Sequence, residues 1–548
     1  MMYDDLLKKI GEFGWYQKRI FAVTCMQPIT SGLLLLISIF TMATPPHRCA
    51  IPGYTNDTYH QQNDYHGNLI NESIPQSSSC LLRNTTVDKY GNMTSLEYKC
   101  SSWVYDTSIF TSTFVTEFDM VCGNATLKSN AVMVLFLGLL FGYGLLGNIA
   151  DLFGRKPLMV VSNYVFVICA YLMVWSPNYT VLLVLRFFLG LSMGGQALTC
   201  YIIGVEFVGP SKRRYTGVIS NLTWCLGLLM ISLFGYLIRN WRYLHLTAAI
   251  FSSHLLFFFL IIPESPRWLL TKGYTVKARK IINEIAKFNK KIISETVINA
   301  LKDPANVTTA KFWKLCSTKK RSLRTFVIYF MWFAVSVSYF GIMLNLESLV
   351  GDIYLNLVLA TIAEAASYMV VILTVERLGR KRLLCGCLVL GSIALIAVIL
   401  IILYAPSDLK WLMTGFTLLG QFGINGAFGV CWLWTSELFP TELRNVGIGT
   451  SSASARIGSV VAPYLKLLGS LMPGRFQEVS PFILFCIVCI VALVLTLLLL
   501  PETFHQNLPD TVEDAERLGD GNGEAVDEKE IAASMLGPEV KRDASFVI

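Results

Sequence analysis

Long apolar stretches alternate with short polar segments along most of this chain. A helix needs roughly 20 consecutive apolar residues to cross the hydrocarbon core of a bilayer, and twelve stretches approach that length. We expect membrane spans at residues 20–43, 130–149, 158–176, 180–204, 216–237, 243–262, 325–346, 353–375, 383–404, 410–435, 447–470 and 481–500. The pattern therefore predicts an all-α membrane protein with twelve transmembrane helices.

A long basic segment separates the sixth span from the seventh and divides the chain into two halves. The domains we expect are a cytoplasmic N-terminus (1–19), an N-terminal six-helix bundle (20–262) with a large outer loop (45–128), a cytoplasmic loop with short helices (263–324), a C-terminal bundle (325–500) and a mostly disordered tail (501–548). With 54% hydrophobic and 15% charged residues, the chain has too little polar surface for a soluble protein of this size.

Lysine and arginine in the short loops set the orientation, because such residues concentrate on the cytoplasmic side. The basic loops 155–156, 212–214, 377–382 and 263–324 all fall on one side of the predicted membrane. Both termini are therefore expected in the cytoplasm, and we expect the protein in the plasma membrane.

The outer loop carries chemistry that suits the opposite side. It holds five N-x-S/T sequons, which are glycosylated only in a lumenal or extracellular setting, at Asn56, Asn71, Asn84, Asn92 and Asn124. It also holds Cys49, Cys80, Cys100 and Cys122. Four cysteines in an oxidising compartment predict two disulfides in one of three possible pairings.

The two halves share an internal repeat, as in many transporters. After span two the chain reads Gly147-Asn-Ile-Ala-Asp151-Leu-Phe-Gly154-Arg155-Lys156, and after span eight Glu376-Arg-Leu-Gly379-Arg380-Lys381. Glu206 with Arg213 recurs as Glu437 with Arg444, and Pro263-Glu264 recurs as Pro501-Glu502. We expect the residues of the two Gly-Arg-Lys loops and both Glu/Arg pairs to control which side of the protein is open.

On these motifs the chain resembles the major facilitator superfamily, whose signature is the acid-x-x-Gly-Arg-Lys loop. The segment Pro263–Leu270, the large outer loop and Pro45-Pro46-His47-Arg48-Cys49 make it most similar to the organic cation, carnitine and organic anion transporters, solute carrier family 22. The resemblance implies two pseudo-symmetric six-helix bundles that alternate around a central site. Ile372 stands where the second repeat of the motif would begin with glycine.

A Gly-x-Gly-x-x-Gly pattern at residues 142–147 is not a dinucleotide site, because it lies inside an apolar span with no preceding soluble strand. Small residues such as Gly138 and Gly142 allow two membrane helices to approach closely, which explains the pattern. The chain also contains no P-loop. Transport powered directly by ATP is therefore disfavoured.

Two ionisable residues lie deep in predicted spans, where a charge costs about 2.5–3.5 kcal/mol on insertion scales. They are Glu364 in span eight and Arg456 in span eleven. We expect them to face a water-filled cavity or each other, and a purely structural ion pair between the two helices is the alternative. Arg186 and Lys466 lie nearer the outer ends of their spans and are expected to be interfacial or packing residues.

Aromatic residues on nearby spans would complete a site for an amine, because ring faces attract ammonium groups. The candidates are Trp332, Tyr339, Tyr368, Tyr201 and Trp432. The family resemblance implies a zwitterionic or cationic amine substrate such as carnitine. Cation-type members have aspartate in place of Arg456, and anion-type members usually have lysine in place of Tyr368. An organic anion/dicarboxylate exchanger and a non-transporting receptor remain alternatives.

Other functions find little support. No nucleophile, base and orienting residue can be assembled, so we do not expect an enzyme, and the basic residues of 264–324 follow from membrane topology rather than nucleic-acid binding. We expect no cofactor, and the sequence leaves sodium or proton coupling open. The tail ends Ser545-Phe546-Val547-Ile548, whose apolar carboxyl terminus could add a strand to a PDZ domain.

Overall fold

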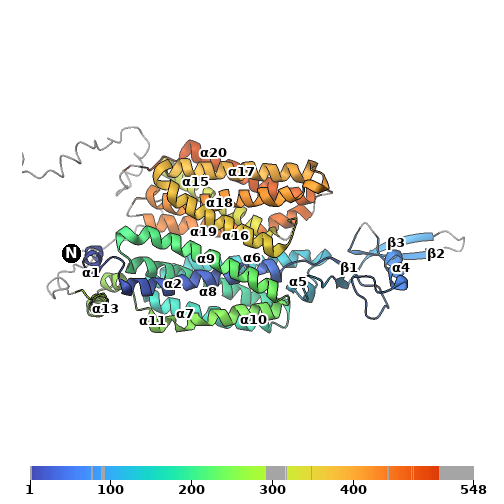
Figure 1. Cartoon of the computed structure of the whole chain (residues 1–548), viewed down its shortest axis with the longest axis horizontal. Coiled ribbons are helices and arrows are strands. Elements are labelled where there is room, and N and C mark those ends of the chain that lie inside the picture. Colours follow the sequence, from blue (N-terminus) through green and yellow to red (C-terminus); the bar gives the residue numbers. More distant parts are fainter. Residues whose placement is uncertain are drawn as a thin grey trace, which may run out of the picture.

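The computed structural model describes residues 3–75, 78–87, 93–291, 315, 317–346, 349–440, 443–470, 472, 474, 476–504 and 506. Residues 507–548 of the predicted tail, which include the PDZ motif, residues 292–314 and Asn92 lie outside these ranges. In Figure 1 the long helices run side by side in two bundles, with a strand-containing segment projecting beyond one end and α1 and α13 at the other.

The N-terminal bundle contains six long helical segments. They are α2 (Trp15–Leu36), continued by α3 (Ser38–Thr41), α6 (Ala125–Phe153), α7 (Arg155–Val174), α8 (Tyr179–Phe207), α9 (Arg213–Leu237) and α10 (Trp241–Ser252), which is extended by η3 (Ser253–Phe257) and α11 (Phe258–Ile261). A 3₁₀ turn, η2 (Pro210–Lys212), precedes α9. The expected six spans of this half are therefore helical, and the sixth changes helix type near its inner end.

The C-terminal bundle repeats this plan. It comprises α15 (Lys319–Leu344), α16 (Ile353–Leu378), α17 (Arg380–Tyr404), α18 (Trp411–Leu438), α19 (Arg444–Ser470) and α20 (Phe476–Leu499), with a short 3₁₀ turn, η6 (Ser407–Leu409), before α18. The packing of the two bundles is pseudo-symmetric. In the N-terminal bundle α8 contacts α6 and α7, and α7 contacts α10. In the C-terminal bundle α18 contacts α16 and α17, and α17 contacts α20.

Eleven helical segments of the described chain are long and apolar enough to span a membrane. The helix missing from this set is α19, although it is 27 residues long. The eleventh expected span is therefore a helix, but it is less apolar than the other eleven. Ser451 and Ser459 of α19 are fully buried, and the helix packs against α6, α15 and α20, so its polar residues face protein rather than lipid.

The glycines of the dismissed nucleotide-like pattern act in helix packing. A Cβ on Gly142 would lie 2.5 Å from the Leu191 carbonyl oxygen and 2.9 Å from Gly194 Cα on α8. A Cβ on Gly138 would meet the backbone of Phe187, and one on Gly194 would lie 2.8 Å from Gly142 Cα. The prediction of close contact at Gly138 and Gly142 is confirmed, because only residues without a side chain allow this approach.

Three short helices lie at the inner end of the N-terminal bundle: α1 (Tyr3–Ile10), α12 (Pro266–Thr271) and α13 (Thr275–Phe288). Asn289, which follows α13, joins α13 and α1 to α2, because its side-chain oxygen accepts from the Tyr16 N–H at 3.0 Å and its nitrogen donates to the Ile10 carbonyl at 3.2 Å. The Phe288 ring packs edge-on against Tyr16, with centroids 5.7 Å apart.

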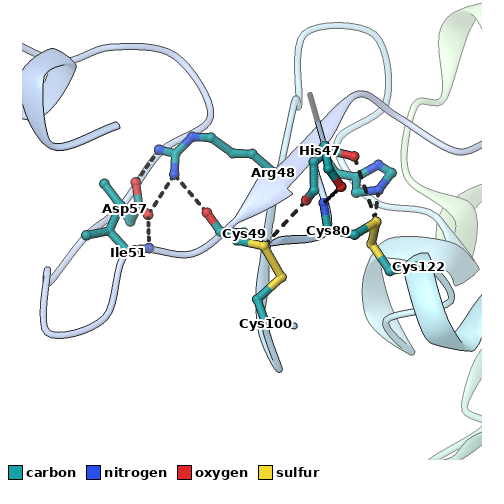
Figure 2. Close-up of a disulfide and its surroundings, with 10 residues drawn as sticks. His47, Arg48, Cys49, Ile51, Asp57, Cys80, Cys100 and Cys122 are labelled. Atoms are coloured by element: carbon teal, nitrogen blue, oxygen red, sulfur yellow. Dashed lines mark hydrogen bonds and ion pairs between the residues drawn. A yellow bond between two sulfur atoms is a disulfide. The ribbon is translucent and has the colours of Figure 1, made fainter. Parts of the chain in front are cut away.

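The outer loop forms a small domain from two antiparallel strand pairs. One joins β1 (His47–Cys49) to β4 (Trp103–Tyr105), and the other joins β2 (Leu81–Val87) to β3 (Met93–Lys99). Helices α4 (Asp64–Ser73), α5 (Phe114–Glu117) and η1 (Cys122–Asn124) complete it. Disulfides link Cys49 to Cys100 and Cys80 to Cys122, which selects one of the three possible pairings (Figure 2).

A buried ion pair also holds this outer domain together. Arg48 and Asp57 are 7% and 6% exposed, and the guanidinium donates to both carboxylate oxygens; Figure 2 shows the two side chains pointing toward each other. Burial alone would raise the pKa of Asp57, but hydrogen bonds from Arg48, the Ile51 N–H and His66 lower it below its usual value. The carboxylate is therefore held in its charged form.

Three of the five predicted glycosylation residues are exposed. Asn56, Asn71 and Asn124 are exposed on the outer domain. Asn84 lies in β2, but its side chain is outside the described part of the chain, as is Asn92. Exposure makes the first three accessible to modification, and glycosylation at all five stays a prediction.

Candidate substrate site and gates

Glu364 is the centre of a polar cluster inside the C-terminal bundle. It is 1% exposed and lies about 17 Å from the outer end of α16, near the middle of the membrane, at 1.5 Å per residue. The Tyr339 hydroxyl donates to its two oxygens at 3.2 and 3.4 Å, and the Tyr368 hydroxyl donates at 3.2 Å. The carboxylate thus acts as a hydrogen-bond acceptor, the role of the anionic form.

Aromatic rings adjoin this carboxylate. Trp332 is fully buried, its Nε1 donates to Thr435 Oγ1 at 2.9 Å, and its ring packs edge-on against Trp432 with centroids 4.7 Å apart. Phe428 on α18 contacts the rings of both Trp332 and Tyr339, at 5.9 and 6.3 Å. The prediction that Trp332 and Tyr339 share a helix face is confirmed by this common neighbour.

Arg456 occupies the interface between the two halves. Its guanidinium carbon lies 4.4 Å from the ring centroid of Tyr143 on α6, which belongs to the N-terminal bundle. Arg456 is partly buried, and its Nε–H has no hydrogen-bond partner. By helix rise it sits about 18 Å from the inner end of α19. The cation is therefore placed at mid-membrane with donor capacity still available.

Glu364 and Arg456 do not pair with each other. Within the described residues, no nitrogen of Arg456 lies within 4.0 Å of a carboxylate oxygen. Two tyrosines hold the carboxylate instead, and the guanidinium rests on a third. The alternative of a structural ion pair locking α16 to α19 is therefore wrong. Cys225 on α9 is close enough to Glu364 to interact with it electrostatically, so the carboxylate also lies near the opposite half.

Tyr201 stands apart from these residues. It lies six residues from the inner end of α8 and is 49% exposed. Among the described contacts, no hydrogen bond or ring packing joins it to Glu364, Arg456 or the aromatic cluster. The structure brings together Glu364, Tyr339, Tyr368, Trp332 and Trp432, and leaves Tyr201 near the C-terminal end of α8.

The Gly-Arg-Lys loop of the first half binds a glutamate at a helix N-terminus. Gly154 has φ +111°, a conformation that residues with a Cβ rarely adopt. The backbone N–H groups of Arg155 and Lys156 then donate to Glu264 at 3.1–3.3 Å. The Arg155 guanidinium lies 2.7 Å from Asp151 and 3.8 Å from Glu206. The loop therefore joins α6, α7, α8 and the segment before α12.

The second half builds the same arrangement. Gly379 has φ +83°, and the N–H groups of Arg380 and Lys381 donate to Glu502 at 3.0 and 3.1 Å. Arg380 lies 3.0 Å from Glu437. The N-termini of α7 and α17 each receive a carboxylate, as expected for an anion at the positive end of a helix dipole.

The other residues predicted to control opening are Gly147, Glu376, Arg213 and Arg444. A Cβ on Gly147 would lie 3.2 Å from Leu198 Cδ2 on α8. Glu376 is exposed at the inner end of α16, and the side chain of Arg213 is outside the described part. Arg444 begins α19. The role of these residues stays a prediction.

Aromatic contacts close the outer ends of the two halves against each other. Tyr354, at the start of α16, stacks on Phe40 of α3 at 5.1 Å and packs edge-on against Tyr236 of α9 at 5.6 Å. Phe110 of the outer domain adds a third contact at 6.4 Å. Nearby, the Tyr464 hydroxyl of α19 donates to Asn130 of α6 at 2.6 Å. The structure is therefore closed on the outer side.

Comparison with known proteins agrees with this architecture. A family model described as "Sugar (and other) transporter" matches residues 64–514. An organic cation transporter protein of Drosophila melanogaster is 33% identical and covers 95% of this chain and 95% of its own length. The human organic cation/carnitine transporter 2 is 30% identical, with 93% of each chain covered.

The chain belongs to the organic cation and carnitine transporter family of the major facilitator superfamily. Among solved structures, the proton:xylose symporter XylE has the same fold, with a TM-score of 0.61, 15% identity and coverage of 92% of this chain and 99% of that one. The protein is a multi-pass membrane transporter of small organic ions and not an enzyme.

Sequence reasoning missed several residues of this transporter. Phe428 and Tyr143 have no signal in a single sequence, because aromatic residues are frequent in all its spans. Tyr354 lies at a span boundary, where aromatic residues are common in any membrane protein. Glu264 and Glu502 had a usable signal, since their Pro-Glu pairs repeat in both halves.

Proposed function

We propose that the transporter carries zwitterionic amine solutes such as carnitine, with cationic amines as weaker substrates. One observation supports this most directly: a carboxylate on α16 and a guanidinium on α19 lie near mid-membrane, and neither neutralises the other. A molecule with a quaternary ammonium group and a carboxylate complements both charges. A human organic cation/carnitine transporter is among the relatives of this chain, which is consistent with this substrate class.

Each residue has a defined part in this proposal. Arg456 binds the substrate carboxylate through the edge of its guanidinium, which suits two parallel N–H donors, while its face stays on Tyr143. Glu364 attracts the ammonium group. The rings of Trp332, Trp432 and Tyr339 provide the faces on which methylated ammonium groups bind.

The test compares a zwitterion with a cation that lacks the carboxylate. In cells expressing the transporter, uptake of labelled carnitine and choline is measured for wild type, Arg456→Lys and Arg456→Ala. A hydrogen bond to a charged group contributes about 1.5–3 kcal/mol, so Arg456→Ala should raise the KM for carnitine about tenfold or more and leave that for choline little changed. Arg456→Lys should fall between the two.

Unchanged carnitine uptake by Arg456→Ala would refute the assignment of charge. A matched variant, Glu364→Gln, keeps the side-chain volume and removes the negative charge, so it should weaken both carnitine and choline. Loss of carnitine alone in Glu364→Gln would show that the carboxylate does not bind the ammonium group.

A second candidate function is exchange of organic anions against a dicarboxylate, and the unpaired donor capacity of Arg456 favours it. Efflux stimulated by external dicarboxylate, without a response to carnitine, would select this function. A receptor without transport would instead bind substrate saturably and never accumulate it. Measuring carnitine uptake at varied sodium concentration and pH determines the coupling ion.

Alternating access would proceed by rocking of the two halves, with the outer aromatic contacts of Tyr354 separating as the loops at Arg155 and Arg380 change their contacts.

We propose the plasma membrane as the location, with both termini cytoplasmic and the disulfide-linked domain outside. Surface labelling with an antibody to the outer domain, without permeabilisation, tests this topology. Capture of a PDZ protein that survives deletion of residues 546–548 would argue against the proposed tail interaction.

A further inference from the structure

Arg186 is a buried cation that the proposed transport site does not use. It lies on α8, is 1% exposed, and donates from Nη2 to the Ser38 hydroxyl of α3 at 2.7 Å. Its Nε–H is buried without a partner. In the described part of the chain, no carboxylate oxygen comes within 4.0 Å of this guanidinium. Of the two roles expected for Arg186, interfacial or packing, its burial agrees with packing.

His245 on α10 adds further unpaired groups to the same region. It is 1% exposed, and neither ring nitrogen has a hydrogen-bond partner. Phe114 of α5 links the two residues, since its ring centroid is 5.4 Å from that of His245 and 6.0 Å from the Arg186 guanidinium carbon. Arg186 and His245 also interact electrostatically.

The charge in this cluster needs a counterion. A guanidinium keeps its proton in proteins, and an uncompensated charge inside a membrane protein is strongly unfavourable. A serine hydroxyl and the Phe114 ring provide dipoles but no negative charge. Because Ser38 accepts from Arg186, its own hydrogen remains available to donate. The cluster therefore offers three kinds of free donor: Arg186 Nε–H, a His245 ring N–H and the Ser38 O–H.

We propose that Arg186, His245 and Ser38 bind a small inorganic anion of halide size, with chloride as the physiological ion. Phe114 and Trp241, which are 0% and 1% exposed, both pack against His245, so an anion bound beside these buried rings must be small. The ion would neutralise Arg186 where α3, α8 and α10 meet the outer domain. Its binding would stabilise the N-terminal bundle and is separate from the substrate site at Arg456.

The experiment measures the melting temperature of the purified full-length transporter at constant sodium and ionic strength while chloride replaces gluconate. Wild type should show a rise that saturates with chloride. Arg186→Gln keeps a hydrogen-bond donor toward Ser38 but removes the charge, and should lose the rise. Arg456→Gln is the matched control at the other membrane arginine and should retain it.

A second variant covers the case in which Arg186→Gln does not fold. Ser38→Asp places a carboxylate beside Arg186, so this protein should melt at the same temperature in both salts. Equal melting of wild type in chloride and gluconate would overturn the proposal, as would a chloride-dependent rise in Arg186→Gln or Ser38→Asp, which indicates a general salt effect. Loss of the rise in Arg456→Gln would place the anion at Arg456 instead.

Discussion

Tyr354 joins the two halves at the outer face, and replacing it should move the transporter toward its outward-open state. The ring contacts Phe40 and Tyr236 at centroid distances of 5.1 and 5.6 Å, and both partners belong to the N-terminal half. Opening the outer side must separate these rings. Tyr354→Ala removes the contacts from the closed state, whereas the open state has none to lose.

The size of the shift follows from the two close ring pairs. Each aromatic pair contributes about 0.5–1.5 kcal/mol beyond its buried area, so together they favour closure by about 1–3 kcal/mol. At 1.4 kcal/mol per tenfold, Tyr354→Ala should raise the ratio of outward-open to outward-closed molecules by about 5-fold to 150-fold. Tyr354→Phe keeps the ring and removes a hydroxyl that has no partner, so it should behave as wild type.

The assay is double electron–electron resonance in lipid nanodiscs, which measures the distance between two spin labels. Spin labels at Trp175 and Tyr404, which are 65% and 79% exposed at the outer ends of α7 and α17, report on outer separation. A genetically encoded keto residue carries each label, so the native cysteines stay unmodified. Unchanged distances in Tyr354→Ala would refute the reasoning, and an equal shift in Tyr354→Phe would show that the ring contacts are not the cause.

Three further predictions concern stability. Gly138→Ala should lower the melting temperature, because the added Cβ would meet the α8 backbone and overpacking costs about 1–3 kcal/mol. The control, Gly144→Ala, should leave the melting temperature unchanged, because no atom lies within 4 Å of the added Cβ. Glu502→Gln should reduce thermal stability about as much as the equivalent change at Glu264, and unequal losses would contradict the structural repeat. Since the folded pKa of Asp57 is lowered, its stabilisation is present above the usual aspartate pKa and is lost as pH falls through the lower folded value. Hydrogen exchange of residues 48–66 should thus show unchanged protection from pH 7 to 5, and loss between those values would contradict the prediction.

The fold and its repeat were accessible from the sequence for clear physical reasons. Hydrocarbon excludes unpaired backbone polar groups, so apolar runs of sufficient length predict helices with little ambiguity. The basic loops predict the orientation, and the two Gly-Arg-Lys loops showed the pseudo-symmetry that the helix contacts display. One departure, the polar helix α19, arose because its serines are buried in protein, where hydropathy is a poor guide.

Cysteine pairing, by contrast, depended on the tertiary structure. Three pairings are equally compatible with the spacing of four cysteines, and the folded outer domain brings together Cys49 with Cys100 and Cys80 with Cys122. Sequence could likewise mark Glu364 and Arg456 as buried charges, but it could not tell whether they pair. Tyr368 of the same helix and Tyr339 of α15 donate to Glu364 instead, and Tyr143 of the distant helix α6 lies against Arg456.

By itself, the sequence determined the helical segments and the family, because these depend on local hydrophobicity and on motifs of a few residues, and it predicts the orientation from the basic loops. Only the tertiary structure decided which side chains contact one another across the bundles. Examples are the tyrosines that donate to Glu364, the Tyr143 ring against Arg456 and the ring contacts of Tyr354. It also decided that Arg186 is buried without a carboxylate partner among the described residues. Such contacts depend on helix rotation and depth, which the apolar pattern constrains to within a turn or so and no further.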